Sequence, residues 1–152
     1  MRSLALALLG IVASSAGAAA GENVVLHAPK AVLHLEVARN EATRRHGLMF
    51  RTSLMPHTGM IFVMPTDARV DFWMKNTRVG LDMIFISEDG RVRSIAARVP
   101  ASPKGLDDGL VAHRAGNARY VIELPSNEAA RDGIRVGTQF SLPPSLKRPT
   151  SD

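Results

Sequence analysis

The sequence predicts a mainly β protein, either an antiparallel β-sandwich or a partly open barrel, with two short helices. Three observations predict this class. About seven short runs are apolar or alternate between apolar and polar residues, as strands do. The dipeptide Asp89-Gly90 separates two such runs, and Asp-Gly favours the tight hairpin turn that needs positive φ at both positions. Only two short stretches carry helix start and stop signals.

The N-terminal 20 residues are expected to be a signal peptide. They contain one cation, Arg2, an apolar run over residues 4–13, and small residues ending at Ala20. The apolar run is too short to span a bilayer. Cleavage is expected after Ala20, so the protein is expected to be periplasmic or secreted. Removing 20 of the 152 residues leaves 132, a single-domain length.

The first half of the domain is expected to run from a strand through a helix to a buried strand. Asn40 suits the N-cap of the helix and Gly47 suits its end. The expected elements, in order, are a lead-in at 21–30, a strand at 31–38, the helix up to 47, a strand at 59–64 covered on both faces, and a turn at 65–68.

The second half is expected to contain two hairpins, a long loop and a final pair of strands. A short helix is expected at 126–133, with Ser126 as its cap. The other expected elements are a hairpin of 69–75 with 81–87, a second hairpin onto 91–97, a loop at 98–118, strands at 119–124 and 135–142, and a disordered tail at 143–152. The single β-rich domain is thus expected to span residues 31–142.

Composition excludes several classes of function. The chain has no cysteine, which excludes disulfides, thiol nucleophiles and thiolate metal sites. The net charge is +5, or +4 once Arg2 is removed, but no run of five like charges occurs. Together with export, this argues against a nucleic-acid partner. No apolar stretch after the signal is long enough to cross a membrane.

The stretch DFWMKNT at 71–77 predicts a binding surface. With a four-residue loop at 76–79, Trp73 lies opposite Asp82, and Lys75 lies diagonal to that carboxylate. The apolar centre of this face is Trp73 with Ile84, Ile86 and Ile95, and charged residues surround it. A tryptophan between a cation and a carboxylate can stack on a sugar or planar ring. The alternative is structural: a second layer covers Trp73, and Lys75 and Asp82 form an ion pair.

Two other functions have weaker support. Six methionines between 49 and 83, with His46 and His57, suit a cuprous-copper carrier, although Met74 and Met83 fall on the expected core face. Asp107, Asp108 and His113 in the long loop are the acid-base candidates of an enzyme acting on envelope carbohydrate. No catalytic motif accompanies them, so no catalytic residue, cofactor or metal ligand is assigned.

The chain resembles the bacterial and archaeal family called domain of unknown function 192. The resemblance covers about residues 32–142 and rests on GLMFR (47–51), GMIFVM (59–64), DFWMKNT (71–77), LDMIFIS with DGRV (81–92), RYVIEL (119–124) and GIRVG (133–137). It implies a compact, mostly β domain, often exported or tethered by one N-terminal segment, and implies no activity. Ser126-Asn127 stands where members commonly have glycine, and the long loop cannot be matched.

The polar and aromatic residues of these motifs are the predicted ligand-binding residues: Arg51, Trp73, Lys75, Asn76 and Asp82. The expected function is that of an exported binding or accessory domain for a polar small molecule or an envelope component. The enzyme and the copper carrier stand as alternatives.

Overall fold

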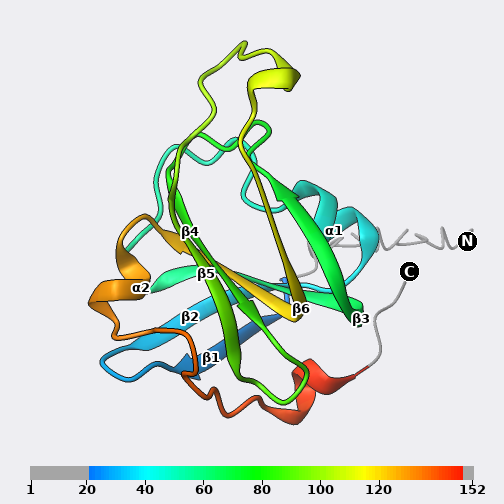
Figure 1. Ribbon diagram of the computed structural model, residues 1–152, viewed down its shortest axis with the longest axis vertical. Coiled ribbons are helices and arrows are strands. Elements are labelled where there is room, and N and C mark those ends of the chain that lie inside the picture. The colour runs from blue at the N-terminus through cyan, green and yellow to red at the C-terminus, as the bar shows by residue number, and fades with distance from the viewer. Residues whose placement is uncertain (1–20, 149–152) are drawn as a thin grey trace, which may run out of the picture.

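The computed structural model describes residues 21–148, and the expected signal peptide lies outside these residues. The chain is mainly β, as predicted, with one six-stranded mixed sheet in the order β1-β2-β3-β6-β4-β5 (Figure 1). The strands are β1 (Asn23–His27), β2 (Val32–Ala38), β3 (Thr58–Trp73), β4 (Leu81–Ile86), β5 (Val92–Val99) and β6 (His113–Pro125). Over residues 21–148 the sheet stays open, with β1 and β5 at its edges.

Two short α-helices accompany the sheet, as the sequence predicts: α1 (Glu41–His46) and α2 (Glu128–Arg131). Two 3-10 helices, Asp108–Leu110 and Pro144–Lys147, complete the regular structure of the described residues. Within 21–148, no helix has the length and apolar character that crossing a membrane requires.

The start and end signals of α1 are confirmed. The Asn40 side chain accepts a hydrogen bond from the Thr43 backbone N–H, and the Thr43 hydroxyl accepts one from the Asn40 backbone N–H. This reciprocal pair satisfies two donors that a helix start leaves free. Gly47 ends the helix with a φ of +49°, a conformation that suits glycine.

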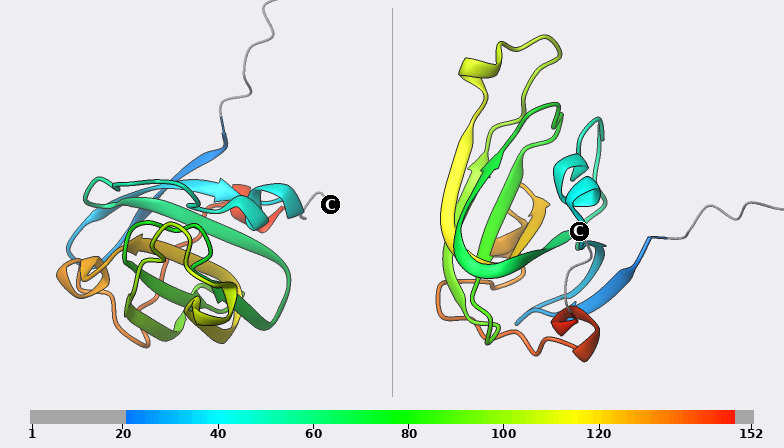
Figure 2. Two further views of the ribbon diagram at one scale, coloured as in Figure 1. Left: turned by 90° about the horizontal axis from the view of Figure 1, so that it is seen from above. Right: turned by 90° about the vertical axis from the view of Figure 1, so that its right-hand side faces the viewer.

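The turn predicted at 65–68 is wrong, because β3 continues through it. The pairing of β3 with β6 shifts register between Val63 and Ala68, so Pro65 lies in the irregular segment, where its missing N–H breaks no ladder bond. The strand bends strongly along its length, and α1 lies on the concave side of the curve (Figure 2).

The predicted hairpin of 69–75 with 81–87 is also wrong. β3 and β4 do not pair, because β6 lies between them and pairs antiparallel with both. The central part of β6, Tyr120–Leu124, is buried throughout, and this position covers both of its edges and both of its faces. Trp73 consequently lies beside His113 of β6 and not opposite Asp82.

The second predicted hairpin is confirmed. β4 and β5 pair antiparallel across Asp89-Gly90, with Ile84 opposite Ile95 as expected. A register shift after Phe85 places Ile86 opposite Val92, where the sequence predicted Arg93. The predicted turn type is wrong, because of Asp89 and Gly90 only Gly90 has a positive φ.

Buried side chains form two cores on opposite sides of the sheet, and β3 supplies both. Ile61 and Val63 point into the first, whereas Met60 and Phe62 point into the second, so the prediction that 59–64 is covered on both faces is confirmed. The first core also contains Leu26, Leu33, Leu35, Ile84, Ile86, Val92, Tyr120, Ile122, Leu124, Phe140 and Leu146. The second also contains Leu48, Phe72, Met74, Leu81, Met83, Phe85 and Val121. Ile84 and Ile86, expected on an exposed binding face, are therefore fully buried.

The two ends of the domain are more ordered than expected. The lead-in at 21–30 contains β1, which pairs with β2. The segment 135–142 is not a regular strand and forms only the isolated bridge between Arg91 and Gln139. Beyond it, Pro144–Lys147 form a 3-10 helix that buries Leu146 in the first core, where the sequence suggested a disordered tail.

The predicted loop at 98–118 is shorter than expected, because its ends belong to strands. Arg98 and Val99 complete β5, and residues 113–118 are the first half of β6. That half of β6 is largely exposed and lacks apolar alternation, so its sequence carries no strand signal.

Candidate functional site

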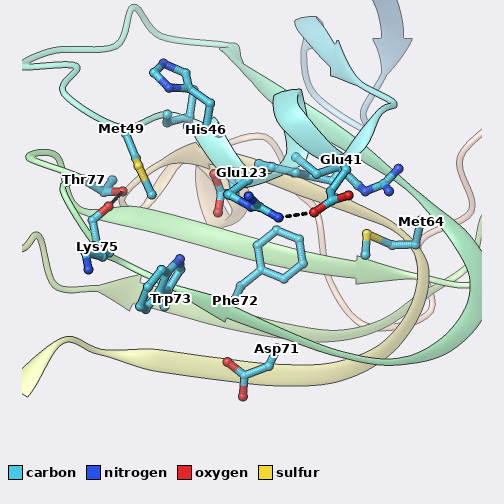
Figure 3. A pocket seen from close by; sticks show the side chains of 15 residues that line it. Glu41, His46, Met49, Met64, Asp71, Phe72, Trp73, Lys75, Thr77 and Glu123 are labelled. Atoms are coloured by element: carbon cyan, nitrogen blue, oxygen red, sulfur yellow. Dashed lines mark hydrogen bonds and ion pairs between the residues drawn. The ribbon is translucent and has the colours of Figure 1, made fainter. Parts of the chain in front are cut away.

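A pocket of about 250 Å³ is lined by residues of α1, of the segment that follows it, and of β3, together with Glu123 of β6 (Figure 3). Its apolar wall consists of Leu48, Met49, Phe62 and Phe72, and charged side chains of α1 and β3 surround it. Trp73 and Lys75 lie side by side at one end, and the carboxyl group of Glu123 lies behind Phe72 (Figure 3). Drug-sized ligands occupy pockets of roughly 300 to 1,000 Å³, so this pocket suits a smaller molecule.

Trp73 and Lys75 lie together at the pocket, as the sequence analysis expects. Trp73 is 41% exposed, and the Lys75 Nζ atom lies 5.0 Å from the centroid of its ring. The carboxylate that pairs with Lys75 is Asp108, at 2.5 Å, and not Asp82. A flat aromatic surface is thus presented to solvent beside an ion pair.

The connection before β6 returns to the same place. The His113 ring lies 6.0 Å from the Trp73 ring, centroid to centroid, and His113 Nδ1 lies 2.9 Å from an Asp71 carboxylate oxygen. Asp108 and His113, two of the acid-base candidates from the predicted loop, therefore both lie beside Trp73.

Glu123 is the pocket residue that the sequence analysis missed. It is 5% exposed, and no residue among 21–148 forms a hydrogen bond or an ion pair with its carboxyl group. Burial alone raises the pKa of Glu123 to about 8, because the charged form loses its hydration without a compensating partner. The group is therefore a neutral acid at pH 7, able to donate a hydrogen bond into the pocket. The sequence feature that could have indicated Glu123 is its position as the one acidic residue in the otherwise apolar run Tyr120–Leu124.

The position of Glu123 follows from the centre of the sheet. It lies on β6 opposite Met60 of β3 and Met83 of β4, and all three side chains face the second core. Gly59 makes the close approach of β3 possible. A Cβ at residue 59 would lie only 1.9 Å from the Glu123 carbonyl oxygen, so any other residue would push these strands apart.

Arg51 and Asn76 do not line the pocket. The Arg51 guanidinium forms two hydrogen bonds with the Glu36 carboxylate, at 2.6 and 2.7 Å, and thereby lowers the pKa of Glu36. Asn76 has a φ of +55°, and its carbonyl oxygen accepts a hydrogen bond from the Phe50 N–H. Arg51 thus links its segment to β2 through Glu36, and Asn76 forms a turn.

Asp82 does not lie beside Trp73, which corrects the predicted cluster, because β6 separates β4 from β3. Its side chain is buried, and the two carboxylate oxygens accept hydrogen bonds from the backbone N–H groups of Arg98, at 2.8 Å, and Ala129, at 3.0 Å. Ala129 is in the first turn of α2, whose N-cap residue, Asn127, makes no side-chain cap bond. Asp82 thus caps α2 from β4, the role that the sequence analysis assigned to Ser126.

The methionines of the copper alternative largely serve packing. Met60, Met74 and Met83 are buried in the second core, where thioethers commonly fill irregular space. His57 belongs to a different group, with Glu128 and Asp132, which could hold a metal ion and shares no residue with the pocket.

Comparison with known proteins adds a family and two structural relatives. The model of the DUF192 family, described as an uncharacterized ACR, matches residues 24–142. A proposed transcription regulator from Sinorhizobium meliloti 1021 is 31% identical, with a TM-score of 0.68 over 80% of this chain and 93% of that one. A protein of unknown function from Novosphingobium aromaticivorans DSM 12444 is 35% identical, with a TM-score of 0.63 over 79% of this chain and 84% of that one. Among curated proteins, none matches. This chain belongs to the DUF192 family.

Proposed function

We propose that the protein is an exported domain that binds a small polar ligand, such as a sugar unit of the cell envelope, in the pocket of Trp73 and Glu123. One observation carries the proposal. An exposed indole and a buried, neutral carboxylic acid line one pocket of about 250 Å³. A buried polar group without a partner costs free energy, and that cost is relieved when a ligand supplies the missing hydrogen bond.

The chemistry of the pocket favours a ligand with an apolar ring face and a hydrogen-bond acceptor. The ring face would stack on Trp73, and a carbonyl or hydroxyl oxygen would accept a hydrogen bond from the Glu123 carboxyl O–H. Lys75 and Asp108, already paired, form a polar rim for hydroxyl groups. N-acetylglucosamine and its short oligomers offer both features and are therefore the first probes.

The experiment is a calorimetric titration of the protein with N-acetylglucosamine and its oligomers, alongside glucose and mannose. Trp73→Ala and Glu123→Leu are each expected to weaken binding at least about tenfold, the effect of losing one interaction worth about 1.4 kcal/mol. Matched controls are Phe50→Ala, another exposed aromatic residue, and Glu88→Gln, an exposed acid. Binding should also weaken above pH 8, where Glu123 loses its proton. A protein that binds none of these sugars at millimolar concentration refutes the sugar class.

A second candidate is an enzyme acting on envelope carbohydrate. Two of the three carboxyl groups that line the pocket lie in different environments: Glu123 is buried and neutral, and Asp71 is exposed beside His113. Glycosidases use a neutral acid and an ionised carboxylate in this way. Release of nitrophenol from aryl glycosides that is lost in both Glu123→Gln and Asp71→Asn would support the enzyme. Sugar binding without turnover would support the binding domain.

Export can be tested separately from binding. The Sinorhizobium relative is described as a proposed transcription regulator, a role that would place the protein with DNA in the cytoplasm. We infer export from the expected signal at residues 1–20. Fractionation of cells that produce a C-terminally tagged chain should find it outside the cytoplasm and shortened by about 20 residues, which follows from the position of the small-residue site. A full-length cytoplasmic chain would contradict export and favour the other role.

A further inference from the structure

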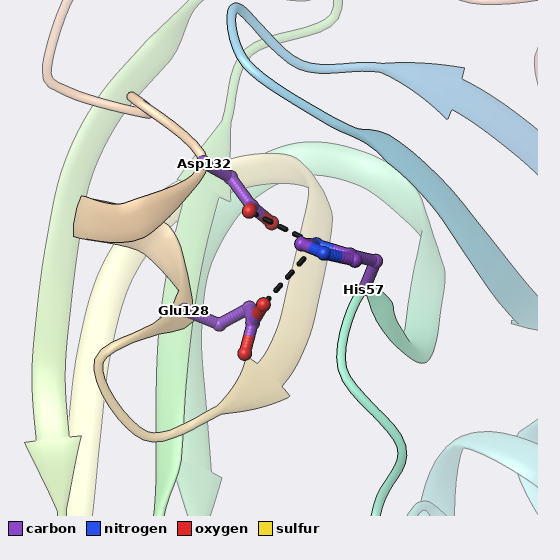
Figure 4. A group of neighbouring side chains, drawn as sticks. All are labelled: His57, Glu128 and Asp132. Carbon is purple, nitrogen blue, oxygen red and sulfur yellow. Dashed lines mark ion pairs between the residues drawn. The ribbon is translucent and has the colours of Figure 1, made fainter.

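Three side chains that can ligate a metal converge on the side of α2 that faces the start of β3 (Figure 4). Glu128 is the first residue of α2 and Asp132 is its C-cap, so their spacing of four residues places both carboxylates on one face of the helix. His57 directly precedes β3. Its carbonyl oxygen accepts a hydrogen bond from the His34 N–H at 2.8 Å, which fixes the backbone that carries the ring.

The distances suit ligands that share one ion. His57 Nδ1 lies 3.1 Å from a Glu128 carboxylate oxygen and 3.0 Å from an Asp132 carboxylate oxygen. Two ligand atoms that are each ~2.1 Å from a tetrahedral zinc ion lie ~3.4 Å apart, close to the two distances from His57 Nδ1. All three ligand atoms lie within 4.8 Å of one another.

Little positive charge balances the two carboxylates of the cluster. The Glu128 and Asp132 side chains are only 3% and 2% exposed, so two carboxylates are buried together. Buried charges are ordinarily paired or bound to metals. A protonated His57 would balance one of them, and the Arg131 guanidinium, itself 69% exposed, is 3.9 Å from Glu128. A divalent cation would balance both carboxylates.

Two buried polar atoms of the cluster have no hydrogen-bond partner among the described residues, as metal ligands without their ion would. The second carboxylate oxygen of Asp132 is buried without a hydrogen-bond partner, and so is His57 Nδ1, which approaches both carboxylates without forming a hydrogen bond. A buried polar atom without a partner costs roughly 1 to 3 kcal/mol. Coordination of one ion by His57, Glu128 and Asp132 would remove this cost for Nδ1 and for the Asp132 carboxylate.

We propose that His57, Glu128 and Asp132 bind a divalent transition-metal ion, best matched by Zn²⁺. One imidazole nitrogen with two carboxylate oxygens suits zinc, whereas Mg²⁺ and Ca²⁺ prefer oxygen ligands alone. Three protein ligands leave a coordination position for water. The site shares no residue with the pocket of Trp73 and Glu123, so it is independent of the function proposed above.

The test is equilibrium dialysis of the purified, EDTA-stripped protein against micromolar Zn²⁺, with metal content measured by mass spectrometry. One equivalent of zinc is expected in the wild-type protein. His57→Gln and Asp132→Asn are each expected to lower the affinity roughly tenfold or more, since even partners outside the ligand shell contribute that much. His46→Gln and Glu88→Gln are the matched controls, because both residues are exposed and lie outside the cluster.

Cobalt substitution supplies a spectroscopic reading of the same site. Co²⁺ bound through His57 should give visible absorption bands in the wild-type and control proteins and none in His57→Gln. Zinc should also raise the Tm of the wild-type protein, because a ligand that binds only the folded state stabilises it.

Two results would overturn the proposal. A wild-type protein that retains no zinc after dialysis shows that the three side chains do not form a zinc site, whether or not the variants fold. Zinc retained equally by the wild type, His57→Gln and Asp132→Asn shows binding elsewhere on the surface.

Discussion

Replacement of Glu123 by glutamine should change how the stability of the protein depends on pH. In the folded protein, burial raises the pKa of Glu123 to about 8, whereas a solvent-exposed glutamate has a pKa of 4.5. Between these two values the unfolded chain releases the proton and the folded protein keeps it. The free energy of unfolding therefore falls as pH rises. This contribution is fully present below pH 4.5 and is lost as pH rises to about 8.

The magnitude follows from the difference between the two pKa values. At about 1.4 kcal/mol per pH unit, the wild type loses up to about 5 kcal/mol of stability across this window. Glutamine does not titrate. The stability of Glu123→Gln relative to the wild type should therefore increase by about 3 to 4 kcal/mol between pH 5 and pH 8. Comparing two pH values cancels any constant cost of packing the amide.

The assay is urea unfolding at pH 5, 6, 7 and 8, followed by the fluorescence of Trp73, the only tryptophan. Glu88→Gln is the matched control: the residue is exposed, so its profile should parallel that of the wild type. If the Glu123→Gln and wild-type profiles stay parallel within about 1 kcal/mol, the carboxyl group is ionised in the folded state. The reasoning about a neutral acid in the pocket would then fail.

Three further predictions concern other parts of the molecule. Gly59→Ala should destabilise the protein by at least about 3 kcal/mol in urea unfolding, because the new Cβ would overlap the carbonyl oxygen of Glu123; an unchanged midpoint would contradict the close approach of the strands. Asp82→Ala should cost about 3 kcal/mol, because two backbone N–H groups lose a charged acceptor, and it should expose the α2 amides to hydrogen exchange; unchanged exchange would rule out its capping role. Trp73 should emit at long wavelength and be quenched by acrylamide, and a blue-shifted, unquenched spectrum would show that the indole is covered.

The elements that the sequence predicted well are those set by local interactions. The cap at Asn40, the doubly covered strand at 59–64 and the position of the hairpin at Asp89-Gly90 were confirmed. Trp73 and Lys75 were also expected together, because two positions along one strand share a face.

The errors came from pairing between distant segments. The loop at 76–79 suggested a hairpin, but β6, which begins only at His113, lies between the two strands. Periodicity within a segment does not state which strand will pair with it. The same error placed Asp82 beside Trp73, although β6 separates their strands and the Asp82 carboxylate caps α2. Glu123 was missed because the strands that surround it, β3 and β4, are distant in the sequence. The residues next to Glu123 do not indicate which strands pair with β6.

The central position of β6 has a consequence for the order of assembly. β3 and β4 have no shared neighbour until residues 113–125 arrive, near the end of the chain. A nascent chain would therefore present unpaired strand edges, the kind of surface on which self-association starts. The sheet is complete only after β6 inserts between β3 and β4, so folding should be slow for a domain of this size. Chaperones should have their largest effect before that insertion.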